Sequence, residues 1–278
     1  MRKKSLTIAP VAPTRHIRCA GKRNGAEDLS ILPPLLQSRK KDGRNIRYCG
    51  PSLCLTLRRK EIEMYLYLIR HGESVCNVQD IFSGRTIETD NPLTKKGQSQ
   101  ARKTARRFRR LDRALTIYYS TARRATATAQ CLARYTGAKM IADERIRGLD
   151  VGKLAGLTKE EAAVKFPEWY SNLAIRPDQY SLEYCLPGGE TNRDLFRRIS
   201  EFWEKALQEQ VDSPVQIVVV AHDDVVEILC HLIMGLSYAG FRQFGRVDNC
   251  SVTGIEFDHG VPKMNYLNDI SHLRRRLY

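Results

Sequence analysis

From Met64 onward the chain alternates strand-like and helix-like segments, and this alternation limits the possible folds more than any other feature. Runs rich in apolar, β-branched and aromatic residues predict five strands, over 65–69, 115–119, 138–142, 215–220 and 251–257. Strands that alternate with helices are joined by crossover connections, so most of them run parallel and helices cover both faces of the sheet. We therefore expect an α/β fold with three α/β/α layers and a mostly parallel central sheet.

Threonine residues are suitable N-caps for three of the intervening helices: Thr94, Thr121 and Thr158. The first two of these helices are expected to end near Arg110 and Tyr135. The clearest amphipathic pattern recurs every three or four residues over 195–207 and predicts another helix. Its apolar members are Leu195, Phe196, Ile199, Phe202, Trp203 and Leu207. We expect their aromatic side chains to belong to the core and not to a ligand site.

The formal net charge of +15 is concentrated at the N-terminus. Residues 1–63 hold 15 Lys and Arg against 5 Asp and Glu, and they lack a helical or strand period. This composition is typical of a disordered basic leader; an organelle-targeting segment and a stretch that is not natively translated are the alternatives. Because Lys60-Glu61 can be encoded by a ribosome-binding sequence just before Met64, we expect translation to start at Met64. An N-terminal peptide spanning Lys60 to Tyr67 in the native protein would contradict this.

The remaining composition predicts a cytoplasmic globular protein. No stretch approaches the roughly 18–20 uninterrupted apolar residues of a membrane-spanning helix, and the N-terminus lacks an apolar signal core. The eight cysteines form no CxxC pair, which argues against a zinc site or a disulfide framework. The basic run over 101–113 has no interleaved aromatic residues, so we interpret it as a solvated helix face and expect no nucleic-acid partner.

Two predicted strands end on histidine, in "LIRH" at His71 and in "VVVAH" at His222. A third strand leads into "STARR", which places Arg123 and Arg124 in the first turn of a helix. Ligands of open α/β sheets bind beyond the carboxyl ends of the strands, and a helix N-terminus favours an anion. The sequence therefore predicts a phosphate site built from these histidines and arginines, with Arg70 beside His71.

Six motifs resemble, in the same order, those of the histidine phosphatases, also called the phosphoglycerate mutase-like superfamily. They are "RHGES" (70–74) with Asn77, Gly84 with "NPLTKKG" (91–97), "STARRATATA" (120–129), "LPGGET" (186–191), "VVVAH" (218–222) and "NCSVT" (249–253). The resemblance runs from Tyr65 to about Phe257 and implies the phosphoglycerate mutase-like version of the three-layer fold. A single RHG tripeptide would be weak support, whereas six ordered motifs are specific.

The resemblance also implies the roles of the site residues. His71 would be the nucleophile that takes the phosphoryl group, Arg70, Arg124 and His222 would bind its oxygens, and Asn77 would assist. The chemistry agrees, because neutral imidazole is a competent nucleophile near pH 7 and arginines neutralise the charge of a transferring phosphoryl group. On this basis we expect neither a metal nor a cofactor.

One departure from the family pattern concerns the proton donor for the leaving oxygen. The larger branch of the superfamily takes it from a glutamate in a segment resembling "RIRGLDVGKLAGLT", and here Gly148 stands at that position. The smaller branch uses the aspartate of a His-Asp pair, which this chain has in His222-Asp223. We hypothesise that Asp223 is the acid, with Asp150 as the second candidate. The alternative is that Asp223 only stabilises the N-terminus of a helix over 223–236.

The sequence thus favours a metal-independent phosphomonoester hydrolase that acts on a small phosphorylated metabolite. A phosphoglycerate mutase is an alternative, although the segment after residue 143 lacks the longer acid-containing pattern of those mutases. A catalytically weak phosphoester-binding regulator is another, because of Gly148. We expect residues 64–278 to form the catalytic domain, with 143–187 as a substrate cap that carries Trp169, Tyr170, Tyr180 and Tyr184. The sequence does not predict the oligomeric state.

Overall fold

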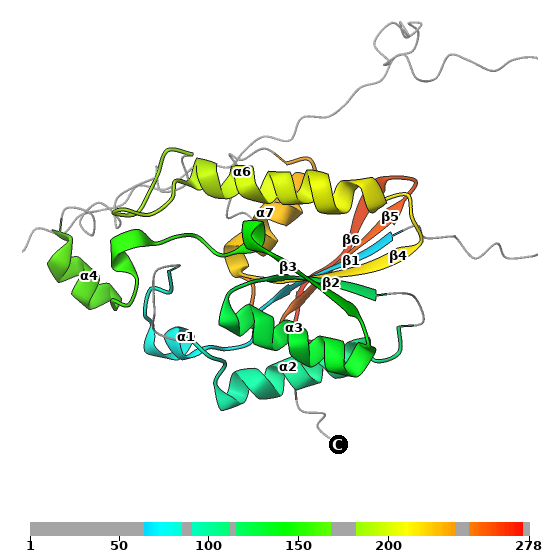
Figure 1. Cartoon of the computed structure of the whole chain (residues 1–278), viewed down its shortest axis with the longest axis horizontal. Helices are drawn as coiled ribbons and strands as arrows, with labels where there is room; N and C mark the ends of the chain where they lie inside the picture. The colour runs from blue at the N-terminus through cyan, green and yellow to red at the C-terminus, as the bar shows by residue number, and fades with distance from the viewer. Residues whose placement is uncertain (1–63, 85–90, 112–114, 168–181, 237–244, 275–278) are drawn as a thin grey trace, which may run out of the picture. The chain divides into compact units, whose positions relative to one another are not determined.

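The computed structural model describes residues 64–84, 91–111, 115–167, 182–236 and 245–274. The predicted leader (1–63) and most aromatic residues of the predicted cap lie outside these ranges. The described strands form one six-stranded sheet in the order β3-β2-β4-β1-β5-β6 (Figure 1). The strands are β1 (Met64–Arg70), β2 (Leu115–Ser120), β3 (Lys139–Asp143), β4 (Val215–Ala221), β5 (Val252–Asp258) and β6 (Val261–Asp269).

The sheet is parallel from β3 through β2 and β4 to β1, and antiparallel from β1 through β5 to β6. This confirms the predicted mostly parallel α/β sheet. The sequence missed only β6 among these strands, because its Pro262, Lys263 and Asn265 do not form an apolar run. A two-residue turn, His259-Gly260, joins β5 to β6. Both of its residues have positive φ, as a type I′ hairpin turn requires.

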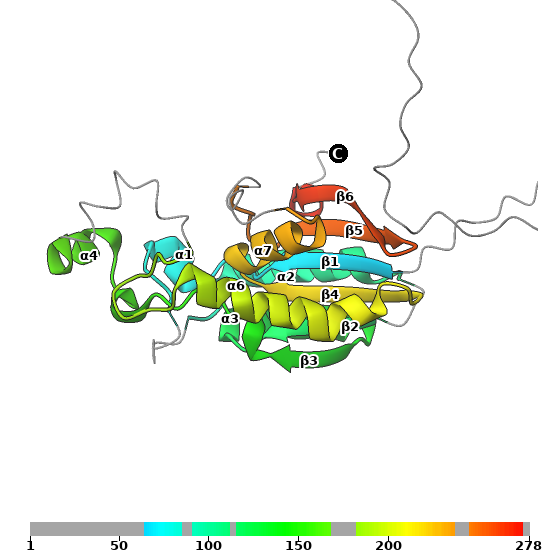
Figure 2. The same cartoon turned by 90° about the horizontal axis from the view of Figure 1, so that it is seen from above.

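Helices cover both faces of the sheet, as expected (Figures 1 and 2). The described helices are α1 (Val75–Gln79), α2 (Lys95–Phe108), α3 (Arg123–Thr136), α4 (Lys159–Lys165), α6 (Asn192–Phe202) and α7 (Asp223–Ile233). Successive residues of a strand point to opposite faces, so Val219 packs with α6 and α7 in one core whereas Val218 and Val220 pack with α2 and α3 in the other. No helix in the described ranges is long and apolar enough to cross a membrane.

Two of the three predicted threonine N-caps, Thr94 and Thr158, are confirmed, and the third, Thr121, is wrong. The Thr94 side chain accepts a hydrogen bond from the Gly97 N–H, and Thr158 forms a capping box with Glu161. At α3 the N-cap is Ala122, one residue later than expected. The amphipathic helix predicted over 195–207 begins at Asn192 and continues beyond α6 through the π-helical turn η5 (Trp203–Leu207). Its aromatic residues pack in the core.

Candidate active site

Both predicted histidines lie where two neighbouring parallel strands end. Arg70, the last residue of β1, is in register with Ala221, the last residue of β4, so His71 and His222 follow side by side. The His71 N–H donates a hydrogen bond to the Ala221 carbonyl over 2.9 Å. The two imidazole rings meet edge to face with centroids 5.2 Å apart, and each residue is only 3% exposed. The sheet register therefore brings together two residues that are about 150 positions apart in the chain.

Arg124 lies between the two histidines, in the first turn of α3. Its Nε donates to His71 Nε2 over 3.0 Å, and its Nη2 lies 3.0 Å from His222 Nδ1. Arg123, the preceding residue, is exposed and does not line the pocket that contains the histidines. The structure thus brings Arg124 and not Arg123 to the histidines, as the motif alignment expected.

Hydrogen bonds define the tautomers of both rings. His71 Nδ1 lies 2.8 Å from the Gly72 carbonyl, which can only accept, so Nδ1 carries the proton and Nε2 keeps its lone pair. His222 Nε2 lies 2.9 Å from the Ser120 hydroxyl, whereas Nδ1 accepts from Arg124. Sequence reasoning assigned no role to Ser120. The His71 lone pair and the Arg124 guanidinium therefore meet at one point, the position expected of a nucleophile beside an anion-binding group.

Burial and positive neighbours keep both rings neutral near pH 7. Burial lowers the pKa of His71 well below 6.5, and Arg124 and Arg70 lower it further, against the opposing effects of the Gly72 carbonyl and Asp223. The pKa of His222 is lowered for the same two leading reasons, burial and Arg124. Burial also lowers the pKa of Arg124 to about 10, which still leaves it charged at neutral pH. The site thus combines an unprotonated nucleophile with a fixed positive charge.

A pocket of about 590 Å³ opens over these residues. Of the predicted site residues, it is lined by Arg70, His71, Asn77, Arg124, His222 and Asp223. Arg70 is held by a 2.6 Å hydrogen bond from Nη1 to the Val247 carbonyl. The amide oxygen of Asn77 accepts from Ser74 and from Asn249, which leaves its amide nitrogen as the donor for a ligand. The pocket is also lined by Gly148, Leu149, Val151 and the segment 246–249.

The two candidate acids occupy different places. Asp223, the first residue of α7, lines the pocket, and its Oδ2 lies 3.3 Å from Nε of Arg246. Asp150 does not line it, because its Oδ1 accepts a hydrogen bond from the Gly152 N–H. The neighbouring Asp224 lines the pocket too, but its Oδ2 accepts a 2.6 Å hydrogen bond from the Leu149 N–H. Of the two predicted acids, the structure brings only Asp223 to the histidines.

Comparison with known proteins decides the family. The sequence pattern of the histidine phosphatase superfamily (branch 1) matches residues 66–270. The chain belongs to this superfamily. The residues that lie at the ends of β1 and β4 and at the start of α3 thus belong to a histidine phosphatase domain, as the six motifs predicted.

Relatives carry the names of phosphatases and of mutases. "Putative phosphoserine phosphatase 2" of Hydrogenobacter thermophilus is 29% identical over 216 residues, covering 76% of this chain and 98% of that protein. "Probable phosphoglycerate mutase GpmB" of Enterobacter sp. (strain 638) is 31% identical over 222 residues, covering 76% and 95%. Among solved structures, Bacillus stearothermophilus YhfR superposes with a TM-score of 0.64 at 27% identity, covering 76% of this chain and all of that one.

Gly148 faces the site of this histidine phosphatase directly. A Cβ added at this position would lie 3.1 Å from Cγ and 3.3 Å from Nδ1 of His222. A side chain at 148 would therefore point at the second histidine from the pocket wall. The glutamate expected here from the family resemblance would have reached the site, and in this chain the position supplies no acid.

Sequence reasoning also missed Arg198, which positions the segment that carries Gly148. Its guanidinium donates to the carbonyls of Arg145, Arg147 and Gly148 over 2.5–3.0 Å and forms a 2.5 Å ion pair with Glu190. Both side chains of the pair are 13% exposed. The "LPGGET" motif was the available signal, because its glutamate is the partner of this arginine.

A thiol also lines the pocket, at Cys76. Burial raises the pKa of Cys76, which disfavours the thiolate and hence a cysteine nucleophile. No group of three or more His, Cys, Asp or Glu side chains within the described ranges is arranged to hold a metal ion. The imidazole of His71 is therefore a better nucleophile in this pocket than the thiol of Cys76.

Proposed function

We propose that this chain is a metal-independent phosphomonoester hydrolase that works through a phosphohistidine on His71 and takes a small phosphorylated metabolite as its substrate. The observation that carries this proposal is the buried, neutral His71, whose Nε2 lone pair lies 3.0 Å from Nε of Arg124. A phosphoryl group placed there would meet the nucleophile and its counter-charge together. The cytoplasmic location predicted from the cysteine pattern belongs to the same proposal.

The first step would transfer the phosphoryl group to the enzyme. His71 Nε2 attacks phosphorus, the bond to the ester oxygen breaks, and Asp223 gives that oxygen its proton. Arg70 and Arg124 balance the charge on the equatorial oxygens. Negative charge beside His222 raises its pKa, which favours protonation of Nδ1 and a further hydrogen bond to phosphate.

The second step would hydrolyse the phosphohistidine. A water attacks phosphorus opposite the histidine nitrogen, and the carboxylate of Asp223 takes the proton of that water. Inorganic phosphate leaves, and His71 returns to the tautomer that the Gly72 carbonyl stabilises. The proton donor of the first step is regenerated, so the cycle is balanced.

Asp223 is proposed as the acid because it lines the pocket, whereas Asp150 does not. Its position in the first turn of α7 would also stabilise the helix dipole, which was the alternative interpretation. A dipole role alone does not require an orientation toward the pocket. The catalytic role would require it.

Phosphoglycerate mutase activity is the second candidate, supported by the mutase names among the relatives. A mutase would pass the phosphoryl group from His71 to a second phosphoglycerate instead of water. Phosphate release therefore separates the two activities.

A phosphate-release assay over a panel of small phosphomonoesters, with a chelator present, tests the proposal. We expect turnover by the native chain, no turnover by His71→Ala, and native turnover by the matched control His259→Asn, whose residue lies on the distant β5–β6 turn. Transfer that occurs only with a second phosphoglycerate would instead indicate the mutase. Binding without turnover by the native chain would overturn both activities in favour of a phosphoester-binding regulator.

A further inference from the structure

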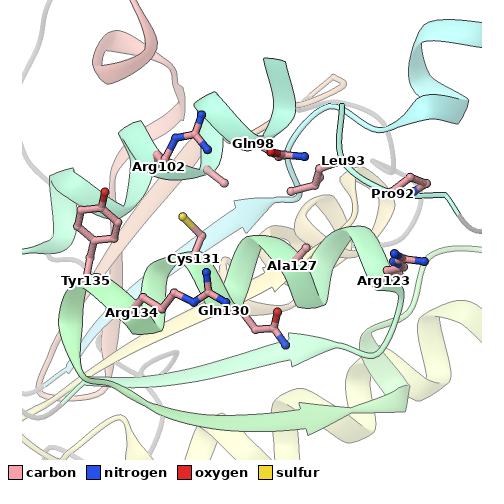
Figure 3. Close-up of a pocket in the computed structure, with 11 residues that line it drawn as sticks. Pro92, Leu93, Gln98, Arg102, Arg123, Ala127, Gln130, Cys131, Arg134 and Tyr135 are labelled. Carbon is pink, nitrogen blue, oxygen red and sulfur yellow. The ribbon is translucent and has the colours of Figure 1, made fainter. Parts of the chain in front are cut away.

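A second hollow lies between α2 and α3, on the face of the sheet opposite α6 and α7 (Figure 3). Its volume is about 480 Å³, within the range of roughly 300–1,000 Å³ that is typical of small-molecule sites. None of its lining residues lines the active-site pocket. It is therefore a separate feature of the molecule.

Helical spacing explains how the hollow forms. Its residues from α3 recur at intervals of three and four and so share one face of that helix: Arg123, Ala127, Gln130, Cys131, Arg134 and Tyr135. From α2 come Gln98, Ala101 and Arg102, which share a face for the same reason. Ala101 and Ala127 are small, so they leave space between the helices that larger side chains would fill.

The side chains that line this hollow carry only positive charge. Three guanidinium groups line it, those of Arg102, Arg123 and Arg134, and none of its lining residues is acidic. The sequences of α2 and α3 contain no Asp or Glu at all. Such a concave concentration of positive charge raises the local concentration of anions.

Other basic side chains of α2 already have partners elsewhere. Lys96 pairs with Glu73, Lys103 donates to the Leu273 carbonyl, and Arg107 forms a 2.5 Å ion pair with Asp269. Within the described ranges, neither Arg102 nor Arg134 forms an ion pair with a carboxylate. These two guanidinium groups are therefore available to a ligand.

We propose that this hollow, the α2–α3 site, binds a small organic anion with two or more phosphate or carboxylate groups. Arginine forks bind both kinds of group through paired N–H donors. Pro92, Leu93 and the two alanines provide an apolar surface for the uncharged part of the ligand. The Pro92 carbonyl accepts a 3.1 Å hydrogen bond from Val75, four residues after His71, so the site also contacts the catalytic loop.

Calorimetric titration of the full chain with ATP, and separately with citrate, tests this proposal and distinguishes the two sources of charge. The double variant Arg102→Ala/Arg134→Ala should weaken binding by about tenfold or more, because each lost guanidinium removes charge-assisted hydrogen bonds. The matched control Arg109→Ala/Arg110→Ala removes the same charge from exposed residues near the end of α2, outside the hollow. It should change affinity by less than about twofold.

Cys131 provides a second readout that the active site does not share, because it is half-buried in the wall of the hollow. The bound anion should slow maleimide modification of Cys131, followed by peptide mass spectrometry, in the native chain and in the control but not in the Arg102→Ala/Arg134→Ala variant. Binding without protection of Cys131 would place the anion outside the hollow and overturn the proposal. An equal loss of affinity in both double variants would show diffuse attraction to the basic face, and no binding of either anion would also refute the site.

Discussion

Replacement of Asp223 by Asn isolates the proposed proton donor. Asn has nearly the same size as Asp, so the pocket keeps its shape, but the amide cannot protonate a leaving oxygen near neutral pH. The need for that proton depends on the leaving group. An alkoxide requires it, whereas nitrophenolate leaves readily without it. Loss of turnover should therefore be much larger for an alkyl phosphate than for p-nitrophenyl phosphate.

The expected loss of activity in Asp223→Asn follows from the surroundings of Asp223. Its ion pair with Arg246 joins side chains that are 21% and 75% exposed, so losing that pair costs at most about 1 kcal/mol, or roughly fivefold. Loss of general-acid catalysis costs about 100-fold or more, which corresponds to about 2.7 kcal/mol in the activation barrier. The two effects are thus separable by size.

The kcat/KM of the native chain and of the Asp223→Asn variant for both substrates gives the comparison, because this constant covers only the steps up to release of the leaving group and not the later hydrolysis in which Asp223 acts as the base. Asp150→Asn is the matched control, because its carboxylate binds the Gly152 N–H outside the pocket. We expect about 100-fold loss on the alkyl phosphate for the first variant and a loss of less than about threefold for the second. A loss below about threefold for Asp223→Asn, or an equal loss on both substrates, would refute the assignment.

Three further predictions concern the site and its support. Gly148→Glu added to Asp223→Asn should restore about tenfold in alkyl phosphate turnover, since its Cβ would point at His222 from 3.1 Å and the ring has to shift by only a few tenths of an ångström. No recovery in a variant that still binds phosphate as the native chain does would contradict this prediction. Burial and Arg124 lower the pKa of both site histidines, so the unfolded chain binds more protons and the free energy of unfolding should decrease as pH falls below about 6.5. Arg124→Gln should raise both pKa values and weaken this dependence, as NMR titration and denaturant unfolding would show. Gly97→Ala should destabilise the fold by about 3 kcal/mol, because its Cβ would lie 2.0 Å from the Glu73 carbonyl oxygen. Gly137→Ala is the control: it has open space around it and should cost only about 1–2 kcal/mol, for its positive φ. Equal melting temperatures of the two variants would contradict the comparison.

The sheet could be predicted from the sequence because most strands are marked by the residues of the strand itself. Five strands carry runs rich in apolar, β-branched and aromatic residues, including β3, an edge strand that has no buried residue, and three helices begin at or next to threonines. β6 was not predicted because it is an antiparallel edge strand whose residues alternate in exposure. The turn at His259-Gly260 was its only sequence signal. The π-helical turn at Trp203–Leu207 was also not predicted, because the apolar spacing of the amphipathic helix continues through it.

The site was predictable where one motif supplied one residue, and not where a residue acts through distant contacts. His71, Arg124 and His222 each end or begin an element, so their convergence follows from the parallel order of the strands. Ser120 and Arg198 act through hydrogen bonds to residues 102 and 50–53 positions away, which no local pattern shows. The same limit applies to Asp150, the second candidate acid from the sequence, whose carboxylate binds within its own loop.

Trapping the phosphoenzyme tests the central claim most directly. The native chain is mixed with p-nitrophenyl phosphate, quenched in alkali, digested and examined by mass spectrometry. We predict the mass of one phosphoryl group on the peptide that contains His71, stable to alkali and lost in acid, and absent from His71→Ala. A phosphoryl group on another residue, such as Cys76, or turnover without any phosphoenzyme in the native chain would contradict the account.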